Sequence, residues 1–428
     1  MDMTFLDNLN GIPATRPGCR FFLAVACRAL ICGIDNFYRT VMAVWGLSIK
    51  YYFCIMSGIY IHIPFCKRKC IYCDFYSVAV SEEKLDAYLD ALVKEYRVRK
   101  AELGGSAVRT LYIGGGTPSL VPAEKLGALL HGLCDVAKLE EVTIEVNPDD
   151  VTPVYARALA EIGVNRVSMG VQSFDDGQLA MLNRRHSGAQ AAEAVATLRQ
   201  AGFSNISIDL IYGIPGQTLE SWAQTVGKAV ALDVPHISAY SLTYEEGTRL
   251  TRMRDAGKLQ ECSDEQTIAM FDLLGRELTE AGYEQYKIPN LPKPGMFSRH
   301  NSSYWNFTPY IGLGASAHSF DGRMRRYNPS DLRSYMAAVG ERGYAYEEEQ
   351  ETADELYNEW VMTRLRTVWG LDLADLRSRF GNRRADYAEK VLARFVDSED
   401  VAIENGLARL THRGIMVSDM IFRDLFLV

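Results

Sequence analysis

The sequence predicts an α/β protein: a partial (β/α)6 barrel followed by a small helical domain of winged-helix type. Three observations predict this fold. Six short apolar runs recur along the first two thirds of the chain, each is followed by a stretch with helical spacing, and helical spacing returns by itself from Thr352 onward. Strand–helix units repeated in series imply a parallel sheet whose strands are joined by crossover helices.

The six apolar runs are expected to be the strands. They are nearly continuous in apolar residues, as parallel strands buried on both faces are. The clearest crossover helix is predicted over residues 81–103, with Glu82 and Glu83 in its first turn, where the helix dipole favours them. The runs are Ile59–Ile63, Thr110–Ile113, Val142–Val146, Arg166–Val171, Ile206–Ile211 and Ile237–Leu242.

Composition narrows the class of protein. The 428 residues include 46 Lys and Arg against 54 Asp and Glu, a formal net charge of −8 that argues against a nucleic-acid partner. The most apolar early stretch, residues 21–34, contains Arg28 and is shorter than the roughly 20 residues that span a bilayer. We therefore expect a cytoplasmic protein. Its oligomeric state stays open, a homodimer included.

The first 55 residues differ from the rest, because they have no clear period and contain four of the nine cysteines. Met56 stands directly before the first predicted strand, so one hypothesis is that translation starts there. The alternative is a genuine extension, residues 1–55. The remaining domains are expected to be a barrel over 56–290, a linker with a polar and aromatic motif over 291–350, and a helical domain over 351–428. In that last domain we expect a strand near 406–411 and a final helix capped by Ser418.

Three cysteines follow the first predicted strand at spacings of four and three residues: Cys66, Cys70 and Cys73. Three thiolates can bind three irons of a [4Fe–4S] cubane and leave the fourth iron open to another ligand. A structural zinc would need a fourth protein ligand, and the nearest, His62, lies inside the strand. A disulfide framework is disfavoured, because three is an odd number and the expected compartment is reducing.

The CxxxCxYC pattern resembles the signature of the radical-SAM superfamily. The resemblance implies that the open iron binds S-adenosylmethionine, which the reduced cluster cleaves to methionine and a 5′-deoxyadenosyl radical. It also implies that the glycine-rich segment Gly114–Pro118, after the second strand, binds the methionine part of that cofactor. A run of glycines lets the backbone approach a ligand closely, so this role is physically reasonable.

Further motifs resemble the oxygen-independent coproporphyrinogen III oxidase group, and the likeness runs from about Gly58 to the C-terminus. They include Tyr-Ile-His-Ile-Pro-Phe-Cys, Glu-Val-Asn-Pro, Gly-Val-Gln-Ser-Phe and Asn-Arg-Arg-His. Taken singly, each matching residue is also consistent with an ordinary structural role. The positions that the resemblance implies for binding S-adenosylmethionine are Tyr60, Tyr72, Gly115, Gly116, Thr117, Glu145, Gln172, Arg184 and Asp209.

Two departures separate this chain from the oxidases and make it resemble most closely the HemW family of haem chaperones. The oxidases carry a further cysteine two residues after the third, where this chain has Phe75, and residues 1–55 show no likeness to the oxidases' N-terminal segment. Residues 300–305 match the HNxxYW pattern of the chaperones. The resemblance implies haem as cargo, a haem-accepting membrane protein as partner, and a low-potential electron donor.

The HNxxYW segment offers His300 as a haem ligand, and His318 is a second candidate. Imidazole is a common ligand of haem iron, and flat aromatic rings suit a macrocycle. The alternative is a structural one, in which His300 hydrogen-bonds a loop and the aromatic residues dock the C-terminal domain. Two other functions also stay open at this point: oxidative decarboxylation of coproporphyrinogen III, and radical chemistry on another substrate.

Overall fold

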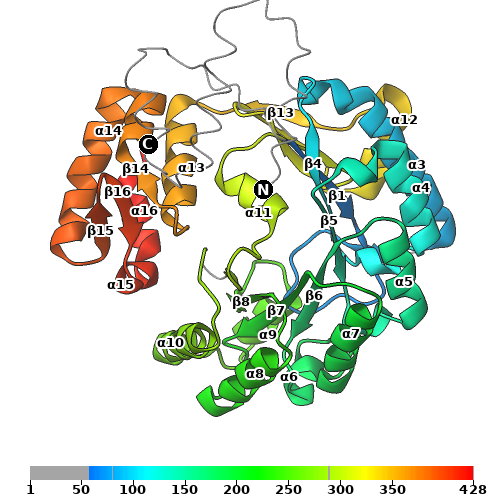
Figure 1. Ribbon diagram of the computed structural model, residues 1–428, viewed down its shortest axis with the longest axis horizontal. Coiled ribbons are helices and arrows are strands. Elements are labelled where there is room, and N and C mark those ends of the chain that lie inside the picture. The colour runs from blue at the N-terminus through cyan, green and yellow to red at the C-terminus, as the bar shows by residue number, and fades with distance from the viewer. Residues whose placement is uncertain (1–56, 80, 288–289, 428) are drawn as a thin grey trace, which may run out of the picture. The chain divides into compact units, whose positions relative to one another are not determined.

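The computed structural model describes residues 57–79, 81–287 and 290–427 (Figure 1). The segment 1–55 and Met56 lie outside these residues, so the hypothesis of a start at Met56 stays a prediction.

One sheet of eleven strands forms the barrel, in the order β13-β12-β11-β10-β1-β4-β5-β6-β7-β8-β9. The six predicted strands are all present and pair in parallel in chain order, which confirms the α/β fold class. They are β1 (Ser57–Ile63), β4 (Val108–Gly115), β5 (Glu141–Val146), β6 (Arg166–Gln172), β7 (Ile206–Tyr212) and β8 (His236–Ser241).

Crossover helices lie along the outer side of these strands, as Figure 1 shows for α3, α4, α5, α7 and α8. Ile59, Ile61 and Ile63 of β1 point outward and pack in one fully buried core with Leu85 and Leu92 of α3. Each such side chain contributes about 1.5–3 kcal/mol through burial. The helices of the barrel are α3 (Glu82–Arg99), α4 (Ala123–Leu133), α5 (Pro153–Glu161), α6 (Asp176–Met181), α7 (Gly188–Gln200), α8 (Leu219–Ala231), α9 (Arg249–Asp255) and α10 (Asp264–Glu280).

The inner side of the strands is polar. Side chains alternate between the two faces of a strand. Tyr60 and His62 stand between the outward isoleucines of β1 and therefore point inward. Tyr60 stands opposite Tyr112 of β4, and their rings stack with centroids 6.2 Å apart. The barrel therefore has an apolar outer layer that holds the helices and a polar interior that is available for chemistry.

The sheet continues where the sequence predicted a linker. Residues 290–292 form a short strand that pairs antiparallel with β8 at the edge of the sheet. Pro292 has no backbone N–H to donate, which an edge strand tolerates better than an inner one. After helix α11 (Arg299–Trp305), strand β10 pairs in parallel with the free side of β1. These strands escaped prediction because each has only three or four residues, too few to show a period. They are β9 (Asn290–Pro292), β10 (Tyr310–Leu313), β11 (His318–Phe320), β12 (Met324–Tyr327) and β13 (Glu347–Gln350), with α12 (Leu332–Arg342) before β13.

The C-terminal residues form the expected small helical domain, whose core includes Trp360, Val361 and Leu365. Its three-stranded sheet has the order β14-β16-β15, and β16 is the strand predicted near 406–411. The prediction that Ser418 caps the last helix is wrong: the cap position is Val417, and no side chain caps it. The elements are α13 (Ala353–Leu365), β14 (Leu371–Asp372), α14 (Leu373–Asp397), β15 (Val401–Glu404), β16 (Leu407–Leu410), α15 (His412–Met416) and α16 (Ser418–Leu425).

Within the described ranges, no helix is both long enough and apolar enough to cross a membrane.

Candidate functional site

The three predicted cluster ligands lie on one loop at the carboxyl end of β1. Cys66 ends the short strand β2 (Phe65–Cys66), which pairs with β3 (Val78–Ala79), and Cys70 and Cys73 follow in the turn between these strands. All three are half-buried free thiols. In the part of the chain that the structure describes, no three His, Cys, Asp or Glu side chains converge on a point where one metal ion would bind. A cubane needs no such convergence, because each thiolate binds a different iron.

Two side chains from outside the cysteine loop donate to these sulfurs: Thr117 follows β4, and Arg184 lies between α6 and α7. The Oγ1 of Thr117 lies 3.4 Å from the Sγ of Cys66, and the Nη1 of Arg184 lies 3.4 Å from the Sγ of Cys70. Burial, followed by the neighbouring thiols, raises the pKa of Cys73 to about 11. Neighbouring segments therefore provide hydrogen-bond donors for anionic sulfur at two of the three cysteines.

The loop opens on a cavity of about 580 Å³ inside the barrel mouth. All three cysteines line it, and so do eight of the nine positions that the sequence implied for the cofactor. The exception is Tyr60, which lies deeper, with its hydroxyl 3.1 Å from the Nδ1 of His62. The carboxyl ends of several strands thus bring together residues that are widely separated in the sequence, as a parallel barrel predicts.

Glycines form the wall of the cavity at the end of β4. A β-carbon on Gly116 would lie 2.8 Å from the carbonyl oxygen of Phe65 and 3.0 Å from the Sγ of Cys66. Gly115 has a φ of +113°, and a β-carbon there would lie 2.9 Å from the ring of His62. A larger residue would have to displace the cysteine loop at Gly116, and at Gly115 it would be strained by the positive φ and would have to displace the ring of His62.

Two half-buried carboxylates face the cavity. Glu145 accepts hydrogen bonds from the Tyr112 hydroxyl at 2.8 Å and from the Gly115 amide at 3.1 Å, and Asp209 accepts one from Ser168 at 3.3 Å. Burial raises the pKa of Glu145 to about 7, and the nearby Asp209 adds to that effect. Burial also raises the pKa of Asp209. These carboxylates suit a ligand with hydroxyl groups or a positive charge.

Arg184 supplies the opposite charge. Its Nη2 donates to Asn147 at 2.7 Å and to the carbonyl of Gly170 at 2.6 Å, while its buried Nε has no partner among the described residues. Next to it, Gln172 has a φ of 67° at a shift of register between β6 and β7, the kind of bulge that re-aims a side chain. The cavity thus combines an unused arginine donor, two carboxylates and three thiols. This combination suits a ligand with both a negative and a positive charge, bound beside an iron–sulfur cluster.

Sequence reasoning missed several contributors to the site. Asn147 and Ser168 line the cavity and orient Arg184 and Asp209. Asn147 stands inside the Glu-Val-Asn-Pro motif, so a signal for it was present. Arg166 gave no signal: it is 1% exposed, donates to His236 at 3.1 Å, and forms no salt bridge within the described residues.

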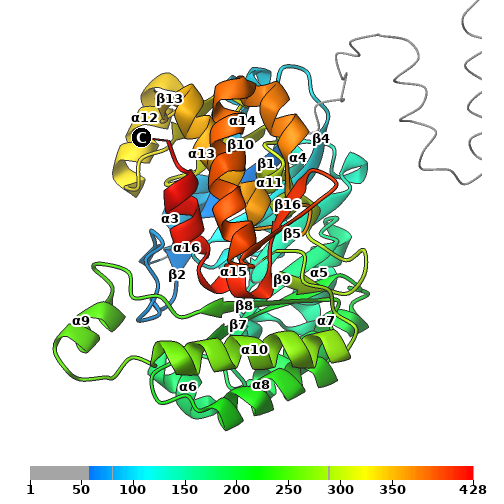
Figure 2. The same cartoon turned by 90° about the vertical axis from the view of Figure 1, so that its left-hand side faces the viewer.

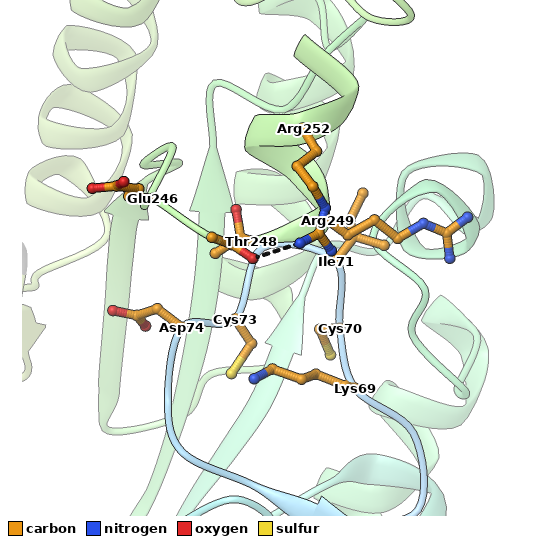
Figure 3. Close-up of a pocket in the computed structure, with 10 residues that line it drawn as sticks. Lys69, Cys70, Ile71, Cys73, Asp74, Glu246, Thr248, Arg249 and Arg252 are labelled. Carbon is orange, nitrogen blue, oxygen red and sulfur yellow. Dashed lines mark hydrogen bonds between the residues drawn. The ribbon is translucent and has the colours of Figure 1, made fainter. Parts of the chain in front are cut away.

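A second cavity of about 400 Å³ lies on the other side of the cysteine loop (Figure 3). Cys70 and Cys73 line both cavities, and Arg249 and Arg252 of α9 come from the opposite wall of this outer one. The amide of Leu250 donates to the carbonyl of Ile71 at 2.8 Å, which fixes α9 against the loop. Figure 2 shows that α9 projects from the body on the side of β2.

The structure places His300 in the interior, away from both cavities. Its side chain is fully buried, its Nδ1 is 2.9 Å from the Thr110 hydroxyl, and its Nε2 is 2.8 Å from the Tyr304 hydroxyl. Its ring stacks on Tyr112, and burial lowers its pKa to about 3. Because both ring nitrogens are in use, this geometry favours the structural alternative for His300. Its role as a haem ligand stays a prediction.

Comparisons with known proteins agree with this site. Residues 60–229 match the radical SAM superfamily, and residues 352–417 match the HemN C-terminal domain. Haem chaperone HemW of Bacillus subtilis (strain 168) is 34% identical over 372 residues, which cover 86% of this chain and 98% of that protein. The chain belongs to the HemW family. HemW of Mycobacterium tuberculosis is 35% identical over 86% of this chain and 94% of its own length.

A solved structure gives the same grouping. The coproporphyrinogen III oxidase HemN of Escherichia coli, described as a radical SAM enzyme, superimposes with a TM-score of 0.74 at 26% identity, over 87% of this chain and 90% of that chain. Membership of the radical SAM superfamily implies S-adenosylmethionine and a [4Fe–4S] cluster as cofactors. The cysteine loop and the cavity beside it are suited to hold both.

Proposed function

We propose that this protein is a haem chaperone that binds haem and delivers it to haem-requiring membrane proteins. The observation that carries the proposal is the similarity to the HemW chaperones over 86% of the chain. Phe75 supports it, because Phe75 stands where the oxidase group has a further cysteine and is 64% exposed at the edge of the cavity. The cluster and S-adenosylmethionine then belong to the chaperone's own core.

Cys66, Cys70 and Cys73 hold the cluster, and the cavity beside them holds S-adenosylmethionine. When bound, the reduced cluster supplies the electron that cleaves the carbon–sulfur bond of the cofactor. Arg184 has a spare donor for the cofactor's carboxylate, and the backbone of Gly115 and Gly116 permits close approach of its methionine part. Glu145 and Asp209 accept hydrogen bonds from its amine and ribose hydroxyls. Tyr72 and Gln172 complete the wall.

The second candidate function is oxidative decarboxylation of coproporphyrinogen III. The superposition on HemN favours it, because the match extends over nearly the whole of both chains. Phe75 argues against it, since a phenyl ring cannot replace a cysteine in chemistry or ligation.

Haem titration tests the chaperone proposal. The anaerobically purified, cluster-loaded protein is expected to bind haem saturably, and the absorbance spectrum of haem should shift as the complex forms. Ovalbumin at the same concentration gives the scale of nonspecific binding. Haem binding no tighter than that to ovalbumin would contradict the proposal.

We also propose that a low-potential, acidic electron donor docks over the outer cavity. Lys69, Arg249 and Arg252 are exposed there, and two of the cluster ligands line the same cavity, so a donor bound at this point would stand next to the cluster. Complementary charge speeds such encounters and makes them sensitive to salt. The support is the local charge: these three cations outnumber the two carboxylates that line the same cavity, Asp74 and Glu246, on a chain whose net charge is −8.

The double variant Arg249→Glu and Arg252→Glu is expected to slow reduction of the cluster by reduced flavodoxin about tenfold at low salt. Stopped-flow bleaching of the cluster measures the rate. Reduction by dithionite should stay unchanged, and Arg276→Glu on α10, which is equally exposed and distant, is the matched control. Equal rates with flavodoxin in the double variant and the wild type would rule out this docking surface.

A further inference from the structure

We propose that His318, rather than His300, binds the iron of haem, a proposal that rests on the chaperone function above. The chain has seven histidines, and all lie among the described residues. Four of them are buried, namely His62, His186, His236 and His300. A side chain without access to solvent cannot receive a macrocycle from solution, so the choice falls on the three exposed histidines.

Two of the exposed histidines are poorly placed. His131 lies near the end of α4, on the outer layer of the barrel. His412 is on α15, and its Nε2 is already engaged, 2.8 Å from a carboxylate oxygen of Asp272. His318 begins β11 in the extension of the barrel sheet, and its ring takes part in no hydrogen bond that the structure describes. An uncommitted imidazole nitrogen is what haem iron needs.

The backbone at His318 is held in place although its ring is exposed. A β-carbon on Gly312 would lie 2.0 Å from the carbonyl oxygen of His318. Only glycine at this position of β10 therefore allows the backbone of β11 to pack so closely. On the other side His318 pairs with Tyr327 of β12, and the two ring centroids are 6.1 Å apart. A fixed backbone with an aromatic neighbour provides both a ligand and a flat surface for a macrocycle.

His318 lies in the same sheet as the strand that leads into the cysteine loop. It begins β11, which pairs with β10, and Gly312 of β10 pairs with Tyr60 of β1. Haem bound at His318 would therefore lie near the radical-SAM site without entering it. This position explains how one chain can keep a complete cofactor cavity and still carry haem as cargo.

The test is a haem titration of full-length, cluster-loaded His318→Ala, with His131→Ala and His412→Ala as matched controls, since all three side chains are exposed. We expect His318→Ala to bind haem about tenfold or more weakly and to lose the imidazole signature in its electron paramagnetic resonance spectrum, while both controls match the wild type. Added free imidazole should restore that signature in His318→Ala, which a merely structural role would not produce.

An unchanged affinity and spectrum in His318→Ala would overturn this assignment. Its failure is distinguishable from failure of the chaperone proposal, because that proposal fails only if the wild type itself binds no haem. Loss of haem binding in all three variants would also overturn the assignment, since it would show no preference for His318.

Discussion

Replacing Cys70 with alanine is expected to abolish the iron–sulfur cluster. The two remaining thiolates would ligate only two irons of a cubane that needs three protein ligands. Removal of Cys70 also leaves the Nη1 of Arg184, 3.4 Å away, without its sulfur acceptor. The measurement is iron per chain after anaerobic reconstitution, together with the visible absorbance of the cluster, and both should fall to background.

Cys134→Ala is the matched control, because Cys134 is another half-buried free thiol that lies far from the loop, at the end of α4. It should keep the iron content of the wild type. Four irons per chain retained in Cys70→Ala would contradict the ligand assignment. A fall in iron for both variants would indicate damage to the fold rather than loss of a ligand.

Replacing His300 with alanine is expected to cost about 2–4 kcal/mol in the free energy of unfolding, because it leaves a buried cavity and two hydroxyl groups without partners. The affinity of the folded protein for haem should not change. Tyr304→Phe is the graded control: it removes only the hydrogen bond to the Nε2 of His300 and should cost about 1 kcal/mol. Chemical denaturation of the apo protein measures both.

The same histidine predicts a pH dependence. Burial lowers its pKa from 6.5 to about 3, so below pH 6.5 the unfolded chain takes up a proton that the folded chain refuses. The wild type should therefore lose stability as the pH falls from 6.5, and His300→Ala should lose less. A His300→Ala variant of native stability with weakened haem binding would instead make His300 a ligand.

The barrel could be predicted because its signal is local. Each of the six strands is an apolar run, and helix α3 has acidic residues in its first turn, while Gly104 ends the 3-10 turn that follows the helix. The strands after residue 289 could not be predicted in the same way. Asn290–Pro292 forms a strand only because β8 offers an edge to pair with, and Tyr310–Leu313 only because β1 offers the other edge.

The same division holds for the site. The cysteines and glycines could be predicted, since their spacing and residue type carry the chemistry. The burial of each histidine could not be predicted from the sequence, and burial decides which histidines are accessible to a ligand. In the sequence His300 and His318 both look like ligands, because each stands near aromatic residues. The structure separates them: Thr110 and Tyr304 occupy both nitrogens of the first, while the second remains exposed.

The most direct test of the central claim is one anaerobic incubation of the cluster-loaded protein with S-adenosylmethionine, dithionite and coproporphyrinogen III. Chromatography of the products reports 5′-deoxyadenosine and any decarboxylated porphyrinogen, with HemN as the positive control. A haem chaperone with a competent radical-SAM core should form deoxyadenosine and leave coproporphyrinogen unchanged. Protoporphyrinogen formed over many turnovers would contradict the account and make this chain an oxidase despite Phe75.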